Sequence, residues 1–314
     1  MKLSEIVAYL NLLDRHDPDI ECRDTMRRFE GVYHVVRNHP IQIDTFSAKL
    51  GEVYTNIENS MREFTNNVLL LRQRLEAERD QLEPEYLRES RRWFDHEQPF
   101  ENNHYILNRR LVADDESNIL IRSHLRNYSD WRLPGMILRP GKDTFIEDLV
   151  PLDPLYLVDH HQELLDFSIT NFNLEYQRRL RPYIVDDRGT GPIMSKLPND
   201  QFGFVFAYNF FNYKPLDLVS KYLDELYQKL RPGGVVLMTF NNCDRAQGAG
   251  LAERNFMCYT PRRYILAHAE SLGFDCIFMH DGQGDLSWVE FRKPGNITSL
   301  RGGQTLAKIV ALPS

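Results

Sequence analysis

The sequence lacks the features that mark secreted, metal-bound and membrane-spanning proteins. It has four cysteines, Cys22, Cys243, Cys258 and Cys276, and none of them stands in a CxxC or Cys/His ligand spacing. We therefore expect free thiols in a reducing, cytoplasmic compartment, and no metal site. No apolar run follows Met1, and no stretch of about 18 apolar residues occurs, so neither a signal peptide nor a membrane span is expected.

Basic charge is also scarce. Lys and Arg number 38 against 45 Asp and Glu, which gives a formal net charge of −7. A general nucleic-acid-binding protein needs a basic face that displaces counterions, so this balance argues against such a partner. Hydrophobic residues make up 42% of the chain and charged residues 26%. That is an ordinary globular composition, and 314 residues suffice for two domains.

The first 95 residues predict a helical region. Apolar residues recur there at steps of three and four: Phe46, Leu50, Val53, Ile57, Met61, Phe64, Val68, Leu71 and Leu75. This spacing puts them on one face of a long helix, and shorter helices are predicted over 3–15 and 22–37. Such a stripe needs other helices to cover it. We therefore expect either a local bundle or a coiled-coil segment, within residues 41–82, that forms a homo-oligomer or docks a protein partner.

Prolines break the helical pattern. Pro84, Pro99 and the polar run 101–104 predict a connector. We place the domain boundaries as follows: a helical region over 1–95, a connector over 96–114, an α/β domain over 115–293 and a tail over 294–314.

From about residue 105, short apolar runs alternate with helical patterns, which predicts βαβ units and a mostly parallel sheet. The predicted strands are 135–138, 155–159, 183–186, 202–207, 235–240, 275–279 and 286–291. The predicted helices are 115–128, 143–149, 161–177, 215–230 and 261–272. Only six turn-rich residues, 280–285, separate the last two strands, so the final strand should run antiparallel.

One stretch of this region carries a family resemblance. Leu230 to Leu237, read as L-R-P-G-G-V-V-L, resembles the L-[RK]-P-G-G-x-[LV] run before the fifth strand of class I S-adenosylmethionine (SAM)-dependent methyltransferases. The resemblance covers residues 115–293. It implies an α/β fold with a seven-stranded, mostly parallel Rossmann-like sheet of order 3-2-1-4-5-7-6, and it implies SAM as the cofactor.

Open α/β sheets bind ligands beyond the carboxyl ends of their strands, which places the cofactor site in the loops after the first four strands. After the first strand, Arg139, Gly141 and Asp143 stand where the family has a glycine-rich loop, and of these only Gly141 is a glycine. Asp159 ends the second strand, with His160 beside it. A carboxylate there can accept the hydroxyls of a ribose, although Asp159 could equally cap a helix.

The third and fourth loops complete the predicted site. Asp186 and Asp187 follow the third strand, where the resemblance implies a residue that bonds the adenine amino group, and Asp186 is the first choice. Ala207 ends the fourth strand, and Tyr208 and Asn209 follow it. The [DNS]-P-P-[YFW] signature of enzymes that methylate exocyclic amines of DNA bases is absent.

Methyl transfer is an in-line displacement that requires alignment and sometimes proton removal, so no fixed triad is expected. The candidate catalytic residues are Tyr208, Asn209 and His160. The long segment 241–260 predicts a lid over the same edge. Two functions remain open. One is an active methyltransferase with an unidentified acceptor; the other is a catalytically silent methyltransferase-like fold that serves in assembly through its helical region.

Overall fold

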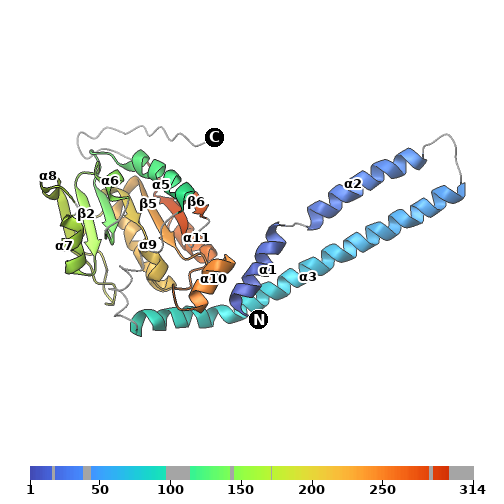
Figure 1. The fold of residues 1–314 in the computed structure, drawn as a ribbon, viewed down its shortest axis with the longest axis horizontal. Coiled ribbons are helices and arrows are strands. Elements are labelled where there is room, and N and C mark those ends of the chain that lie inside the picture. Colours follow the sequence, from blue (N-terminus) through green and yellow to red (C-terminus); the bar gives the residue numbers. More distant parts are fainter. Residues whose placement is uncertain are drawn as a thin grey trace. The chain divides into compact units, whose positions relative to one another are not determined.

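The computed structural model describes residues 1–15, 18–37, 44–96, 114–141, 145–170, 172–282 and 286–296. The chain divides into two compact units, Met1–Pro84 and Glu85–Ser314. Figure 1 shows the helices of the first unit and the sheet of the second.

The first unit is helical, as the sequence predicts. Helix α1 (Leu3–Arg15) has the predicted bounds, whereas α2 (Pro18–Arg37) begins four residues earlier than expected. Proline fits the first turn of a helix because the N–H that it lacks would have no partner there. The core of this unit is small: Ile6 and Leu10 of α1 pack against Leu75 of helix α3 (Asp44–His96).

The expectation that Pro84 breaks the helical pattern is wrong. Helix α3 continues through this proline to His96, and the boundary between the two units falls there. Proline removes one helical hydrogen bond, so packing must hold the turns that follow. Trp93 is buried in the core of the second unit, and the Ser90 hydroxyl accepts a 2.7 Å hydrogen bond from the Tyr259 backbone N–H. These contacts keep the last turns helical.

The second unit contains the predicted sheet. Its strands are β1 (Gly135–Leu138), β2 (Leu155–Asp159), β3 (Leu180–Ile184), β4 (Phe202–Ala207), β5 (Leu230–Phe240), β6 (Asp275–Asp281) and β7 (Ser287–Arg292). Their order is 3-2-1-4-5-7-6. The first five strands pair in parallel, whereas β7 runs antiparallel to both β5 and β6. The predicted strand order and the antiparallel final strand are confirmed.

Helices cover both faces of this sheet (Figure 1). Successive residues of one strand enter different clusters: Ile137 joins one core, and Met136 and Leu138 join the other. The first core lies under α5 (Asp115–Tyr128), α6 (Ile146–Leu149), α7 (Gln162–Thr170) and α8 (Leu174–Gln177). The second lies under α9 (Leu216–Lys229) and α11 (Arg262–Ser271). Both faces being buried explains the nearly unbroken apolar runs.

Some predicted bounds are wrong. Strand β3 starts at Leu180, not Tyr183, because it lies at an edge of the sheet, where Arg181 and Pro182 are tolerated although they break the apolar run. The predicted helix 161–177 is two helices, α7 and α8. The start of the predicted helix 143–149 lies outside the described residues. The described part of that segment contains the short helix α6, Ile146–Leu149.

Strand β5 likewise starts earlier than predicted. It begins at Leu230, directly after α9, instead of at Val235. The Gly pair bulges out of the strand: Phe202 faces Leu230, but Phe204 faces Val235. Gly233 has φ +76°, which favours glycine, so the chain makes a sharp turn inside the strand.

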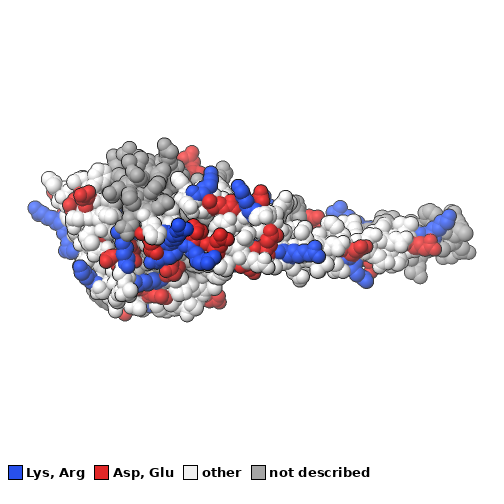
Figure 2. Space-filling model, turned by 90° about the horizontal axis from the view of Figure 1, so that it is seen from below, with Lys and Arg blue, Asp and Glu red and all other residues white. Residues whose placement is uncertain are grey.

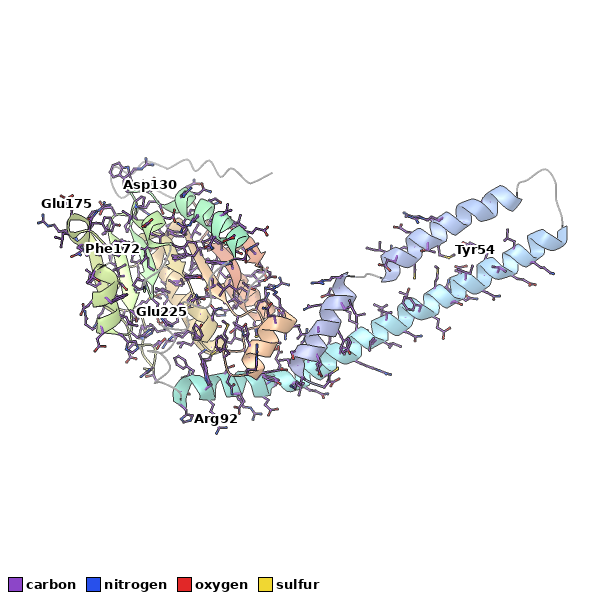
Figure 3. All side chains as sticks on the ribbon, viewed as in Figure 1. Tyr54, Arg92, Asp130, Phe172, Glu175 and Glu225 are labelled. Atoms are coloured by element: carbon purple, nitrogen blue, oxygen red, sulfur yellow. The ribbon has the colours of Figure 1, made fainter. Side chains whose placement is uncertain are left out.

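A loop between β3 and β4 is fixed by one buried acid. Glu225 of α9, labelled in Figure 3, accepts 2.6 Å hydrogen bonds from the backbone N–H groups of Ile193 and Met194.

On the surface, Lys and Arg alternate with Asp and Glu over the face drawn in Figure 2. Among the described residues, no helix has the length and apolar character needed to cross a membrane.

The centre of the sheet leaves no room for a larger residue at Gly135. A Cβ there would lie 2.3 Å from Cδ1 of the buried Leu152 side chain. We expect Gly135→Ala to lower the free energy of unfolding of this unit by about 1–3 kcal/mol, because Leu152 must move within a packed core. All three tryptophans, Trp93, Trp131 and Trp288, belong to the second unit, so tryptophan fluorescence during urea unfolding reports on it alone.

The matched control is Gly191→Ala. Gly191 is exposed, and a Cβ there meets nothing within 4 Å. It should change the free energy of unfolding by less than about 0.5 kcal/mol. Equal effects of the two substitutions would contradict the packing described for Gly135.

Candidate cofactor site

The loop after β1 bends as a glycine-rich loop would. Arg139 has φ +56° and Gly141 has φ +49°, and the Arg139 N–H donates a 2.7 Å hydrogen bond to the Val158 carbonyl of β2. Arg139 thus adopts a left-handed conformation that glycine takes without steric cost. Its guanidinium lies 6.0 Å from the centre of the Tyr213 ring. The predicted Asp143 lies outside the described residues.

Asp159 ends β2 with a buried carboxylate. Its Oδ1 accepts hydrogen bonds from the backbone N–H groups of His160, at 2.6 Å, and His161, at 3.1 Å. Both lie before α7, which begins at Gln162, so the carboxylate orders the turn ahead of the helix. Its other oxygen, Oδ2, is buried and has no hydrogen-bond partner among the described residues. A buried carboxylate oxygen without a donor is costly, so Oδ2 is ready to accept one.

The two acidic residues after β3 differ in exposure and in their hydrogen-bond partners. Asp186 is exposed, and its Oδ1 accepts a 2.9 Å hydrogen bond from the Arg188 N–H. Asp187 is buried, and its Oδ2 meets three side chains: the Lys214 ammonium and His160 Nε2 at 2.8 Å each, and the Tyr222 hydroxyl at 3.1 Å. Asp187 Oδ1 is buried with no hydrogen-bond partner in the described part of the chain.

These contacts set the protonation of the cluster. Burial by itself raises the pKa of Asp187, but the hydrogen bond from His160 and the positive charge of Lys214 more than offset it, and the net pKa lies well below its usual range. Burial, with the neighbouring Asp187, raises the pKa of Tyr222 well above its usual value. Asp187 is therefore a carboxylate and Tyr222 a neutral hydroxyl, which donates to it.

Lys214 is a residue that the sequence interpretation missed. Its side chain is 3% exposed, and its ammonium lies 4.8 Å from the ring centre of Phe94 and 5.1 Å from that of Phe210. The Phe210 ring also stacks on His160 at 5.8 Å. One signal was available: Lys214 stands just before α9, at a helix N-terminus, where a cation is unfavourable without an acidic partner.

The predicted residues after β4 lie in different surroundings. Tyr208 packs in the core under α5 and α6, stacking on Trp288 at 5.4 Å and meeting Phe145 edge-on at 5.2 Å. Asn209 is buried with φ +52°, and its N–H donates a 2.7 Å hydrogen bond to Thr239 Oγ1. Ala207 is fully buried in the core under α9. The structure thus brings Asp159, His160 and Asp187 together, whereas Tyr208 packs on the other face.

The predicted lid is well packed. Segment 241–260 contains a short helix, α10 (Ala246–Glu253), that was not predicted. Asn241 closes the segment, because its Nδ2 donates to the carbonyls of Gly248, at 3.0 Å, and Cys258, at 2.9 Å. A Cβ on Gly248 would lie 2.2 Å from the Asn242 carbonyl oxygen, so glycine permits this close approach.

Comparison with known proteins gives structural likeness only. No protein-family model and no curated protein matches the chain. An S-adenosylmethionine-dependent methyltransferase from Mesorhizobium loti is 13% identical, with 55% of this chain and 96% of that chain covered and a TM-score of 0.43. The N-methyltransferase NodS from Bradyrhizobium japonicum WM9, in complex with S-adenosyl-L-homocysteine, is 15% identical, with 61% and 98% covered and a TM-score of 0.44. A methyltransferase from Aquifex aeolicus is 12% identical, with 58% and 90% covered and a TM-score of 0.41.

The fold is nevertheless defined by this chain's own topology. The order 3-2-1-4-5-7-6, with β7 antiparallel between β5 and β6, is that of class I SAM-dependent methyltransferases.

The Asp187–Lys214 pair makes a prediction about stability. Lys214→Met leaves a buried carboxylate without its ammonium, so we expect a loss of about 3–5 kcal/mol in the free energy of unfolding at neutral pH. The pKa of Asp187 is lowered in the folded protein, so its stabilisation is present above its unfolded pKa, about 3.9, and is lost as the pH falls. The difference between wild type and Lys214→Met should therefore shrink below about pH 4 in urea titrations.

The control adds Asp187→Asn to Lys214→Met. The double variant leaves neither member of the ion pair as an uncompensated buried charge. It should therefore recover part of the lost stability, and its free energy of unfolding should depend less on pH. A destabilisation by Lys214→Met that stays constant from pH 7 to pH 3 would contradict the ion pair.

Proposed function

We propose that the chain is a SAM-dependent methyltransferase. The observation that carries this proposal is a pair of buried carboxylate oxygens, Asp159 Oδ2 and Asp187 Oδ1, with no hydrogen-bond partner among the described residues. They follow neighbouring parallel strands, where the Val185 N–H bonds to the Asp159 carbonyl at 3.0 Å. Two adjacent acceptors at the carboxyl edge of such a sheet suit the hydroxyl and amino donors of a nucleoside.

Each residue then has a role toward the cofactor. Asp159 would accept the ribose hydroxyls. Asp187 would accept the adenine amino group, in preference to Asp186, because Asp186 is exposed and already accepts the Arg188 N–H. The turn formed by Arg139 and Gly141 would bring its backbone close to the methionine part. When bound, SAM supplies an electrophilic methyl group on a sulfonium.

The acceptor would lie beyond β4. Tyr208 is partly exposed, and Thr239 holds the backbone of Asn209. Both residues would orient the methyl acceptor, and His160 would form part of the adjacent cofactor loop. The Tyr208 ring packs against the Phe145 and Trp288 rings, which would hold it in place. Because methyl transfer depends mainly on alignment, such positioning accounts for most of the expected catalysis.

One observation favours the second function, a silent fold used in assembly. The left-handed position that the family gives to glycine carries Arg139, whose side chain occupies space beside the turn. The first unit fits the same role, because we infer from its apolar stripe that residues 41–82 dock a protein partner or a second copy of the chain. A measurement of SAM binding distinguishes the methyltransferase from the silent fold, because only the methyltransferase must bind SAM.

Calorimetric titration with SAM and with S-adenosyl-L-homocysteine tests the proposal. We expect the wild type to bind both and Asp159→Ala to weaken binding at least about tenfold, because hydrogen bonds to a charged acceptor contribute about 1.5–3 kcal/mol. Asp187→Asn should weaken binding as well, and Asp186→Asn should not.

The matched control is Asp166→Asn, which changes an exposed carboxylate on α7 that binds only the Gln162 amide among described side chains. It should leave the affinity unchanged. A wild type that binds neither ligand at millimolar concentration would rule out the enzyme and leave the assembly role.

A further inference from the structure

Helix α3 carries apolar side chains that its own unit does not cover. Five of them are 47–56% exposed: Val53, Phe64, Leu69, Leu70 and Leu71. The described part of this unit buries few apolar residues, among them Ile6, Leu10 and Leu75. Three helices with so small a core need another apolar surface to be stable in water.

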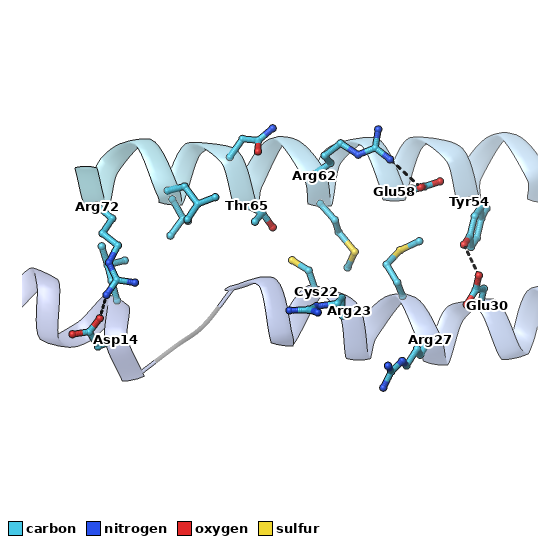
Figure 4. A pocket seen from close by; sticks show the side chains of 16 residues that line it. Asp14, Cys22, Arg23, Arg27, Glu30, Tyr54, Glu58, Arg62, Thr65 and Arg72 are labelled. Carbon is cyan, nitrogen blue, oxygen red and sulfur yellow. Dashed lines mark hydrogen bonds and ion pairs between the residues drawn. The ribbon is translucent and has the colours of Figure 1, made fainter. Parts of the chain in front are cut away.

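The same stretch of α3 forms one wall of a groove. The groove lies between α3 and the helices α1 and α2 and has a volume of 840 Å³ (Figure 4). It is lined by apolar residues such as Met26, Met61 and Leu69 and by charged residues such as Arg27, Glu58 and Arg62. A hydrogen bond from the Tyr54 hydroxyl to Glu30 crosses it at one end, at 3.3 Å, and an ion pair between Arg72 and Asp14 crosses it at the other. Residues 54 and 72 are about 27 Å apart along the helix, a length that fits five helical turns.

The exposed stripe has the length of the groove. It runs from Val53 through Phe64 to Leu71, which share one face of α3 at 3.6 residues per turn. In two antiparallel copies that meet through this face, Val53 of one copy would face Leu71 of the second. This is the arrangement of a four-helix bundle made from two helical hairpins.

Charge along α3 favours this antiparallel pairing. Residues 50–62 contain Glu52, Glu58 and Arg62, a net charge of −1, whereas residues 63–74 contain Glu63, Arg72 and Arg74, a net charge of +1. Antiparallel copies place the acidic half against the basic half, and parallel copies would place like charges together. Glu52 and Arg74 are exposed and make no ion pair with any described residue.

We propose that α3 pairs with α3 of a second copy of this chain, antiparallel, through the Val53–Leu71 stripe, with Glu52 of each copy within one helical turn of Arg74 of the other. This inference rests on the docking role proposed for residues 41–82 and names its partner. The two Glu52–Arg74 pairs set the direction of the helices, and the Phe64 rings lie near the two-fold axis.

A charge-swap experiment on the full chain tests the pairing. Sedimentation equilibrium should show a wild-type dimer at micromolar concentration. Glu52→Arg and Arg74→Glu should each raise the dimer dissociation constant at least tenfold, because each places like charges together. The double variant Glu52→Arg/Arg74→Glu should return it to within about threefold of wild type, since the pairs are restored with reversed sign.

Two further variants keep the result interpretable. Phe64→Glu should give a monomer, with circular dichroism confirming that the helices remain. Arg92→Glu, an exposed arginine on α3 in the second unit (Figure 3), should leave the dimer unchanged. A wild type that is monomeric at tens of micromolar, or a double variant no tighter than the single variants, would overturn the pairing. Titration with S-adenosyl-L-homocysteine on the same samples shows separately whether the proposed enzyme stands.

Discussion

The arrangement of the candidate site depends on one buried carboxylate, Asp187. Its Oδ2 meets groups from three places in the chain: His160 after β2, Lys214 after β4 and Tyr222 in α9. A charge taken out of water needs such partners, and their removal leaves it uncompensated. The loops at the carboxyl edge of the sheet are therefore fixed relative to one another before any ligand binds, which is the preorganisation that a binding site requires.

The same cluster shows how the end of helix α3 takes part in the second unit. Phe94 covers the Lys214 ammonium, and Ser90 holds the backbone of Tyr259 at the end of the segment that contains α10. Residues 85–96 thus help to exclude water from the charged cluster and to hold the segment beside the site. The helical turns after Pro84 belong by packing to the α/β unit, although their sequence continues the helical region.

Most of the fold followed from patterns in the sequence. Apolar runs located the strands of the sheet, and the short link between the last two strands predicted the antiparallel β7, because a hairpin-sized loop cannot cross a sheet. The errors fall where tertiary contacts override local signals. Pro84 is a helix breaker that packing overcomes, and β3 contains Arg181 and Pro182 because its outer edge faces solvent.

What the sequence determined by itself is the order of elements and the acids at their ends, since strand periodicity and turn residues are local properties. Asp159 and the pair Asp186–Asp187 could be located in this way. Only the tertiary structure decided that Asp187 is the buried member, because Lys214 and Tyr222 are distant in sequence and meet it only when α9 packs on the sheet. The exposure of the α3 stripe was likewise settled by folding, since periodicity defines a face but not what covers it.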